Sequence, residues 1–209
     1  MLLARIFLPV RKNISIMKKT LATLAAAAVI FASCNNQASK DSVEKADSVN
    51  TVKTDSPATV KEVIKTDEES TAFLVKAANG GMAEVKLAQL AKDKAKDTAV
   101  QHFADMMIAD HGGANEKVKA LAAERNVTLP AEPGADEQKM AADLSKKSGA
   151  DFDKAYVSAM VKGHEETLDL FKKASAKVSD GGVKTFVDNT IPVIEHHLMR
   201  IKDIKKGMK

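Results

Sequence analysis

Apolar positions from residue 66 onward repeat with the period of an α-helix, and no alternating strand pattern interrupts them. The repeats predict four long helices, over about 66–96, 97–125, 151–177 and from the turn at 179–182 to about 206. A shorter repeat predicts a helix over about 137–147. Turn-forming residues separate these segments, most clearly the two prolines and the glycine within 126–136. TDEE at 66–69 resembles a capping box, which would begin the first long helix with Thr66 as its cap.

Four long amphipathic helices, two tight turns and one long middle connection predict an all-α fold, a ferritin-like four-helix bundle. The long connection joins the second and third long helices, so it is the crossover of the bundle, and it carries the short extra helix. The bundle would occupy residues 66–209, which is enough chain for one hydrophobic core.

Each long helix places one titratable side chain on or beside its apolar face when residues are spaced about 100° apart on a helical wheel. Of the adjacent histidines in the last helix, His197 lies between apolar neighbours and His196 lies on the opposite side. All four inward residues are near the middle of their helices, so antiparallel packing would bring them to one layer. They are Glu84, His111, His164 and His197.

Such a layer has the composition of a metal site in a bundle core. A buried carboxylate without donors or a cation is strongly disfavoured. Three imidazoles and one carboxylate suit one transition-metal ion, zinc, copper, iron or nickel. Two methionines, each four residues before an inward histidine, would favour reduced copper. The further candidate ligands are Asp110, Asp153, Met107 and Met160.

A metal-free interpretation also fits these residues. The four inward side chains could form a buried hydrogen-bonded network that fixes the register of the bundle. The two methionines could simply fill space in the core. The sequence leaves both interpretations open.

The segment before the bundle predicts export. From Met17 the chain has two lysines, an apolar run and Ala-Ser before a cysteine, which is the order of a lipoprotein signal peptide over 17–33. Cys34 would then carry the lipid, and an ordinary cleaved signal with an incidental cysteine is the alternative. Residues 1–16 precede a complete signal, so we interpret them as an upstream mis-start.

Residues 34–65 are rich in Ser, Asp, Lys and Thr and contain no large apolar cluster. Such a composition predicts a flexible, lipidated tether, because it cannot bury enough surface to offset its ordering entropy. The expected location is therefore the cell envelope, with the membrane as partner through Cys34, at either the periplasmic or the outer membrane. A protein partner is not identifiable from the sequence.

The net charge of +4 does not indicate a nucleic-acid partner. Residues 1–33 contain five basic residues and no acidic ones; subtracting these five from 32 leaves 27 basic residues against 28 acidic ones, about −1 after signal cleavage. With 4% aromatic residues and no tryptophan, the chain offers no basic stripe and no stacking platform. Nucleic-acid binding is excluded on this ground.

Four segments in order resemble the bacterial family called domain of unknown function 4142: NGGMAEVKLAQLA (79–91), FADMMIADH (103–111), FDKAYVSAMVKGHEETLDLF (152–171) and IPVIEHHL (191–198). The resemblance covers about residues 68–205 and implies an exported or outer-membrane protein with a ferritin-like bundle. It matches the polar positions Glu84, Asp110, His111, Asp153, His164 and His197. Gly112 and Gly113 depart from the family's commoner polar pair. The resemblance implies no activity.

A ferritin-like di-iron oxidase is disfavoured by the sequence. Such sites need a Glu-x-x-His motif on each of two helices. The residues three before the inward histidines are Ile108, Val161 and Ile194. We therefore expect a metal-binding protein for buffering, sensing or envelope stress, without catalytic residues. The alternatives are a metal-free structural or interaction lipoprotein and, third, a ferritin-like oxidoreductase.

Overall fold

The computed structural model of the chain describes residues 41–54 and 66–208. Six helices occupy this part of the chain: α1 Ser42–Thr54, α2 Glu68–Lys94, α3 Thr98–Glu124, α4 Ala135–Ser145, α5 Gly149–Lys177 and α6 Gly181–Gly207. The expected signal peptide, mis-start and lipidated cysteine lie outside the described residues.

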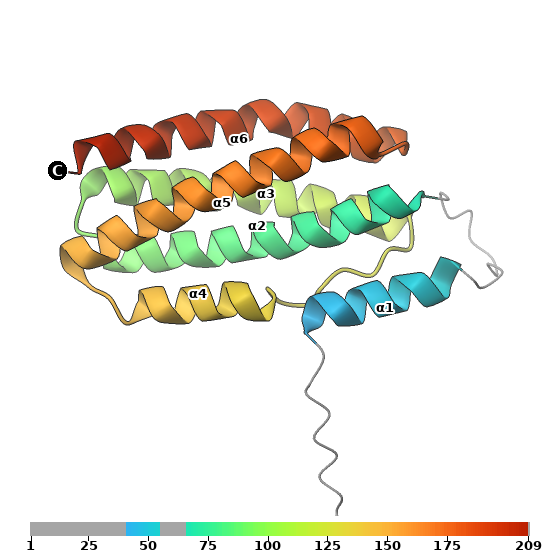
Figure 1. Cartoon of the computed structure of the whole chain (residues 1–209), viewed down its shortest axis with the longest axis horizontal. Helices are drawn as coiled ribbons and strands as arrows, with labels where there is room; N and C mark the ends of the chain where they lie inside the picture. Colours follow the sequence, from blue (N-terminus) through green and yellow to red (C-terminus); the bar gives the residue numbers. More distant parts are fainter. Residues whose placement is uncertain (1–40, 55–65, 209) are drawn as a thin grey trace, which may run out of the picture. The chain divides into compact units, whose positions relative to one another are not determined.

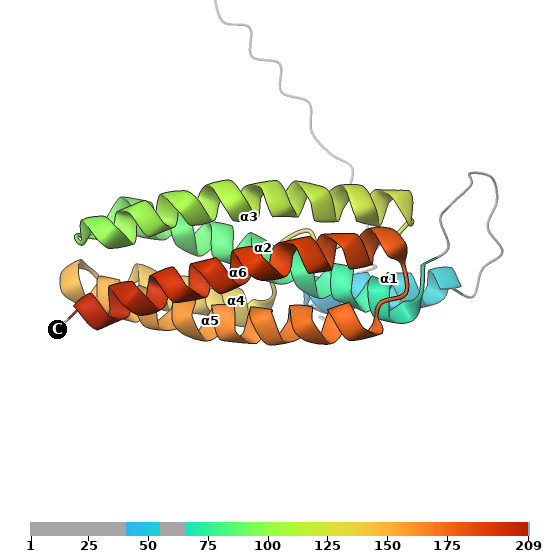
Figure 2. The same cartoon turned by 90° about the horizontal axis from the view of Figure 1, so that it is seen from above.

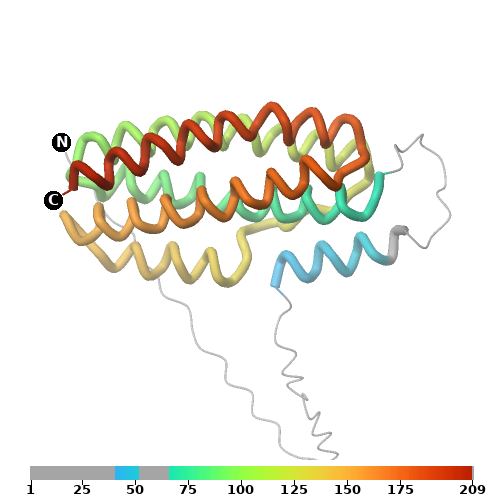
Figure 3. The backbone as a smooth tube through the Cα atoms, turned by 45° about the horizontal axis from the view of Figure 1, so that its top comes forward, coloured from blue at the N-terminus to red at the C-terminus, as the bar shows by residue number. Residues whose placement is uncertain are grey.

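Four long helices form the bundle, as the sequence predicts (Figure 1). Helices α2 and α3 make one antiparallel hairpin, and α5 and α6 make the other. Because α3 ends at one end of the bundle and α5 begins at the other, the chain must return along the bundle. The segment 125–134 and α4 make this return, and Figure 3 follows it as a tube. Seen from above, α3 and α6 run side by side along the bundle (Figure 2).

Aspartates begin three of the four long helices. Asp67, Asp97 and Asp180 each accept a hydrogen bond from a backbone N–H of the first turn that follows. The cap of α2 is therefore Asp67, whose side chain accepts from the Ser70 N–H at 2.8 Å, and the prediction of Thr66 as the cap is wrong by one residue. The negative charge of an aspartate also complements the positive end of the helix dipole, which a threonine does not provide.

Helix α1 corrects the predicted tether. Ala46 is 2% exposed, and one helical turn later Asn50 is 6% exposed. The Asn50 amide donates to the Thr128 carbonyl at 2.9 Å and accepts from the Thr128 N–H at 2.7 Å. The Asp41 carboxylate accepts from the Ala135 N–H at 3.0 Å and so caps α4. The flexible tether expected over 34–65 therefore does not extend over 41–54, where these contacts hold the segment against the bundle. Residues 34–40 and 55–65 lie outside the described residues.

Arginine 125 closes one end of the bundle. Its guanidinium donates from Nε and Nη2 to the two oxygens of the Asp180 carboxylate, at 2.8 and 2.7 Å. Each of these side chains is 4% exposed. The pair ties the end of α3 to the start of α6, and Asp180 also caps α6 through the Val183 N–H at 2.9 Å.

The apolar core consists of two clusters. One contains Leu87, Phe103, Met107, Tyr156, Met160 and Ile201, among others. The second contains Phe73, Leu74, Val118, Phe171, Val187 and Ile194, among others. On every long helix the predicted inward polar residue falls between the members of the first cluster and those of the second. The polar layer therefore divides the core of the bundle.

Two features that could interrupt the helices near this layer do not do so. Helix α3 continues through Gly112 and Gly113, and α6 continues through Pro192. Both helices therefore carry their inward histidines on regular helical turns. Among the described residues, no helix is long and apolar enough to cross a membrane.

Candidate metal centre

The four residues that the helical wheels place inward are all buried. Glu84 on α2 is 6% exposed, His111 on α3 8%, His164 on α5 0% and His197 on α6 1%. His196 is exposed, in agreement with the wheel. Each helix of the bundle thus contributes one titratable side chain to the interior, as expected of antiparallel hairpins with residues at matched heights.

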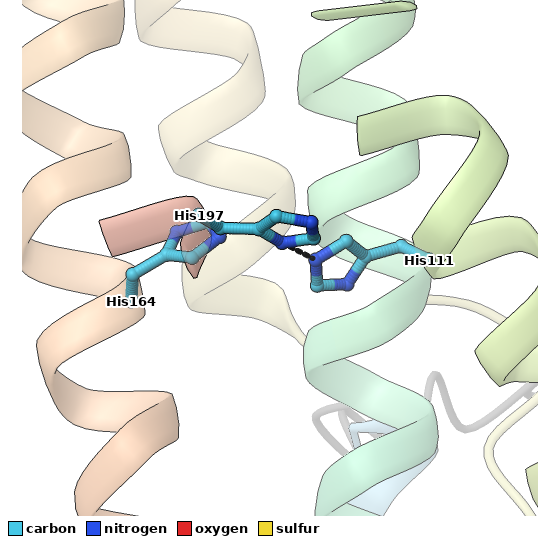
Figure 4. A group of neighbouring side chains, drawn as sticks. All are labelled: His111, His164 and His197. Carbon is cyan, nitrogen blue, oxygen red and sulfur yellow. Dashed lines mark hydrogen bonds between the residues drawn. The ribbon is translucent and has the colours of Figure 1, made fainter. Parts of the chain in front are cut away.

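The three histidine side chains converge in the centre of the bundle (Figure 4). One ring nitrogen of each lies within 4.8 Å of a ring nitrogen of both others, so the three could hold one ion. The closest pair is Nε2 of His111 and Nδ1 of His197, at 3.3 Å. The geometry therefore groups three imidazoles from α3, α5 and α6.

The other nitrogen of each imidazole faces a hydrogen-bond acceptor. Nδ1 of His111 lies 2.9 Å from Oε2 of Glu84, and Nε2 of His197 lies 2.9 Å from Oδ2 of Asp110. Nδ1 of His164 lies 2.9 Å from the main-chain carbonyl oxygen of Met160, one turn earlier in α5. A neutral imidazole that donates from one nitrogen carries a lone pair on the other. These acceptors therefore fix the tautomers that turn a lone pair inward.

The inward nitrogen of His164 has an unusual environment. Its Nε2 is buried and has no hydrogen-bond partner among the described residues. A buried polar atom without a partner costs about 1–3 kcal/mol. An imidazole in this state is prepared to donate its lone pair to a cation.

The hydrogen-bonded series of side chains Glu84–His111–His197–Asp110 has one proton too few. It contains three contacts, and each needs one proton to be a hydrogen bond. Two neutral imidazoles supply only two protons. Without a bound ion, this series must therefore hold an extra proton. Otherwise the lone pairs of His111 Nε2 and His197 Nδ1 face each other at 3.3 Å.

The pKa shifts indicate where an extra proton would reside. Burial lowers the pKa of His111, but the adjacent Glu84 carboxylate more than offsets burial, so the pKa lies above its ordinary value. Burial lowers the pKa of both His164 and His197 below the ordinary value, and the neighbouring histidines add to this effect. Burial alone would raise the pKa of Glu84, but the three imidazoles, His111 foremost, bring it below its ordinary value. The layer thus holds an ionised Glu84, two neutral histidines and one histidine that competes for a proton.

Two of the predicted ligands lie on the outer side of the imidazoles. Glu84 and Asp110 each contact the outer nitrogen of a histidine, whereas the inward group consists of histidine nitrogens alone. Their carboxylates would therefore orient the imidazoles and supply negative charge. Carboxylates in this position raise the basicity of metal-bound histidines in known sites.

Asp153 does not join the layer, and its binding of an ion stays a prediction. Its carboxylate accepts from the backbone N–H of Asp97 at 2.9 Å and from that of Lys96 at 3.2 Å. It thus closes the turn between α2 and α3, at the end of the bundle. The residue faces inward about three turns before His164, as the wheel predicts.

The two methionines lie in the apolar core beside the layer. Met107 and Met160 are buried in the apolar cluster on one side of the layer. Met160 contributes to the centre through its carbonyl oxygen, a role that the sequence does not signal because every residue carries a carbonyl. Binding of an ion by their sulfur atoms stays a prediction.

A cavity of about 70 Å³ adjoins the layer. It borders His111, His197 and both carboxylates, and residues of all four long helices line it. Its apolar wall includes Ala77, Leu170, Phe171, Phe186 and Ile194. No pattern in the sequence signals this space, because its lining comes from all four long helices.

Comparison with solved structures supports the fold. The crystal structure of a DUF305 fragment from Deinococcus radiodurans is similar to the chain, with a TM-score of 0.61 at 10% sequence identity. The match covers 68% of this chain and 99% of the fragment. At this identity the likeness concerns the fold alone. A comparison with curated proteins gives no match at a significant level.

The family comparison agrees with the motifs. Residues 53–204 match the family described as domain of unknown function 4142. The match begins within α1, contains α2, α3, α5 and the buried histidine layer, and ends within the last turn of α6. The chain therefore belongs to the family called domain of unknown function 4142.

Proposed function

We propose that this protein binds one transition-metal ion through His111, His164 and His197. The observation that carries the proposal is the arrangement of the three imidazoles: each has its outer nitrogen on an acceptor, which leaves an inward lone pair. Glu84, Asp110 and the Met160 carbonyl would act as outer partners. Such pairs of acceptor and histidine are the usual support of metal-bound imidazoles.

The spacing of the nitrogens supports this proposal. Metal–nitrogen bonds of about 2.0–2.1 Å in tetrahedral geometry place two ligand nitrogens about 3.3–3.4 Å apart. The distance between Nε2 of His111 and Nδ1 of His197 is 3.3 Å. These two nitrogens could therefore bind one ion with little rearrangement, and His164 would approach by a small movement of its ring.

Charge balance points the same way. Three neutral imidazoles add no charge, so a divalent ion would bring +2 into the core. The carboxylates of Glu84 and Asp110 supply −2 at the outer nitrogens. A divalent ion would also remove the need for an extra proton in the series Glu84–His111–His197–Asp110. It can accept the two lone pairs of His111 Nε2 and His197 Nδ1 that face each other.

Imidazole ligands indicate the class of ion. Nitrogen donors suit zinc, copper, iron and nickel, whereas magnesium and calcium prefer oxygen. A set of three histidines does not choose among the four. Metal buffering or sensing requires binding without turnover, and we propose this role rather than catalysis.

The competing proposal is a metal-free network that holds the bundle in register. The hydrogen bonds of His111 and His197 fit it, but the unpartnered Nε2 of His164 does not, since a network gains nothing from that nitrogen. The two proposals therefore differ most sharply at His164.

The deciding experiment compares His164→Ala with His102→Ala in protein prepared without a histidine tag. Metal content after exposure to zinc or copper is the measurement. Metal binding predicts about one ion per chain in the parent and in the control, whose His102 is exposed on α3, and a loss of bound metal in His164→Ala. Equal, negligible metal in all three proteins would refute the proposal.

We further propose that the chain is held at a membrane of the cell envelope by lipid on Cys34. The support is the order of basic, apolar and small residues over 17–33 followed by the single cysteine of the chain. A single cysteine cannot form a disulfide within the chain, so lipidation gives it a reason to be there.

A further inference from the structure

We propose that the metal ion, once bound as in the proposed function on which this inference rests, takes a small uncharged donor molecule from the adjacent cavity as its fourth ligand. The cavity is the space of about 70 Å³ that borders His111 and His197. The inference concerns what the site accepts, and it goes beyond the binding of the ion itself.

The protein offers an incomplete set of ligands. The inward group contains three histidine nitrogens, and the carboxylates of Glu84 and Asp110 are engaged with the outer nitrogens. Structural zinc sites are closed by four protein ligands, whereas sites with three protein ligands keep a position for water or substrate. A bound ion would therefore have a vacant position that an outside molecule can fill.

The cavity adjoins the histidine layer. It borders two of the three histidines and extends between α2, α3, α5 and α6. A water molecule needs roughly 10–15 Å³ of comparable space, and a cavity of about 150 Å³ holds benzene. By proportion, the volume of about 70 Å³ accommodates a molecule of about three non-hydrogen atoms.

The Asn115 side chain of α3 occupies the place that a side chain at Gly81 of α2 would take. A Cβ atom there would collide with the Asn115 side chain of α3. Gly80 also lines the cavity, and a Cβ atom at that position would meet nothing within 4 Å. Gly81 therefore lets the Asn115 amide approach α2, and Gly80 leaves room beside it.

The charge of the surroundings selects an uncharged molecule. The two carboxylates already balance a divalent ion, so an anionic fourth ligand would leave a net negative charge in the core. Much of the lining is apolar, with Leu170, Phe171 and Phe186 among its side chains, and its one lysine, Lys76, is exposed to solvent. Burying a charge in apolar surroundings is strongly unfavourable. A neutral donor of equal size should therefore bind better than an anion.

The test uses the full chain loaded with cobalt(II), whose visible spectrum reports its ligands. Methyl isocyanide and azide are the probes, because each has three non-hydrogen atoms and only azide is charged. We expect saturable changes of the cobalt bands and a shifted C≡N infrared stretch with methyl isocyanide. Binding of azide should be at least tenfold weaker.

Variants that fill the cavity test whether methyl isocyanide binds there. Ala114→Leu on α3 and Ala77→Leu on α2 each add a side chain to the lining from a different helix, and Ala123→Leu adds the same side chain at an exposed position of α3. We expect both lining variants to bind cobalt as the parent does and methyl isocyanide at least tenfold more weakly. The exposed control should behave as the parent.

The outcomes separate this inference from the proposed function. Cobalt binding with a spectrum that neither probe changes would overturn the inference and leave the metal site standing. Tighter binding of azide than of methyl isocyanide, or equal binding by the filled variants, would overturn it as well. Absence of cobalt binding in the parent would overturn the proposed function and the inference together.

Discussion

His196 and His197 are neighbours in α6, yet the first is exposed and the second is 1% exposed. His197 lies between His111 and Asp110: its Nδ1 is 3.3 Å from Nε2 of His111, and its Nε2 is 2.9 Å from Oδ2 of Asp110. Adjacent residues on a helix differ by about 100° in direction, so one can face the core while the other faces water. A variant at the exposed His196 is therefore a matched control for the same substitution at the buried His197.

We expect His197→Ala to lower the free energy of unfolding by about 1–3 kcal/mol, because the partners in the layer lose a buried hydrogen-bond partner. His196→Ala should change it by no more than about 0.5 kcal/mol. Urea unfolding and thermal unfolding, each with and without zinc or copper, are the measurements. The metal should raise the melting temperature of the parent and of His196→Ala but not that of His197→Ala. Equal losses in the two variants would contradict the buried assignment.

Glu84→Gln should weaken metal binding without abolishing it. Glutamine can still accept from His111 Nδ1, but it removes the negative charge that supports the imidazole. Loss of an outer partner typically lowers metal affinity by about 10–100-fold. Competition with a chelator of known affinity measures the change, and the exposed substitution Glu165→Gln on α5 is the control. Complete loss of the ion in Glu84→Gln would instead make the carboxylate a direct ligand.

Acid should destabilise the metal-free protein in part through His164. Burial lowers the pKa of His164 below its ordinary value of 6.5, so the unfolded chain binds a proton there more readily than the folded chain. The stability that depends on a neutral His164 is therefore present above about pH 6.5 and is lost as the pH falls below it. Each tenfold difference in proton affinity is worth about 1.4 kcal/mol.

The variant His164→Gln isolates this effect, because glutamine does not titrate. Urea unfolding at pH 7.5 and pH 5.5, in the presence of a chelator, should show a smaller loss of stability in His164→Gln than in the parent. His196→Gln should retain the loss seen in the parent. A loss of the same size in His164→Gln would show that other groups cause the acid sensitivity.

Removal of Arg125 should be the most damaging change at the end of the bundle. Arg125→Ala leaves the Asp180 carboxylate, 4% exposed, without its cation, and breaking a buried pair in this way costs about 3–5 kcal/mol. Lys92→Ala removes an equally short ion pair with Asp105 whose side chains are 59% and 52% exposed. That change should cost at most about 1 kcal/mol. Thermal unfolding of the two variants gives the comparison, and similar losses would refute it.

Cys34→Ser tests the proposed anchor. The variant should appear in the soluble fraction and should no longer incorporate labelled fatty acid, because the lipid is the proposed link to the membrane. Fractionation and fatty-acid labelling of cells that express the parent or the variant are the measurements. A variant that remains in the membrane fraction and still takes up label would refute lipidation at this residue.

The periodic pattern was sufficient to predict the bundle and the burial of Glu84, His111, His164 and His197, because direction around a helix depends only on residue spacing. It did not identify the partners of Asp153. This residue also faces inward, but it lies 11 residues before His164, which is about 16 Å along the helix axis. At that height the backbone N–H groups of the α2–α3 turn are its partners.

Helix α1 escaped prediction for a different reason. Its burial depends on Ala46 and on the amide of Asn50, which pairs with Thr128 across 78 positions of the chain. A segment with so little apolar surface carries no periodic signal, since its stability comes from the partner segment rather than from its own side chains. The pairing of Arg125 with Asp180 also cannot be predicted from the sequence pattern, because it depends on the end of α3 lying beside the start of α6.

The cap that Asp41 places on α4 limits how far the protein could extend from a membrane. Only six residues, 35–40, separate Asp41 from Cys34. Fully extended, that linker spans at most about 25 Å, whereas the 32-residue tether expected from composition would span about 110 Å. If Cys34 carries lipid, the start of α1 is confined to a thin zone above the headgroups. An ion or small molecule would then reach the histidine layer from the immediate neighbourhood of the bilayer.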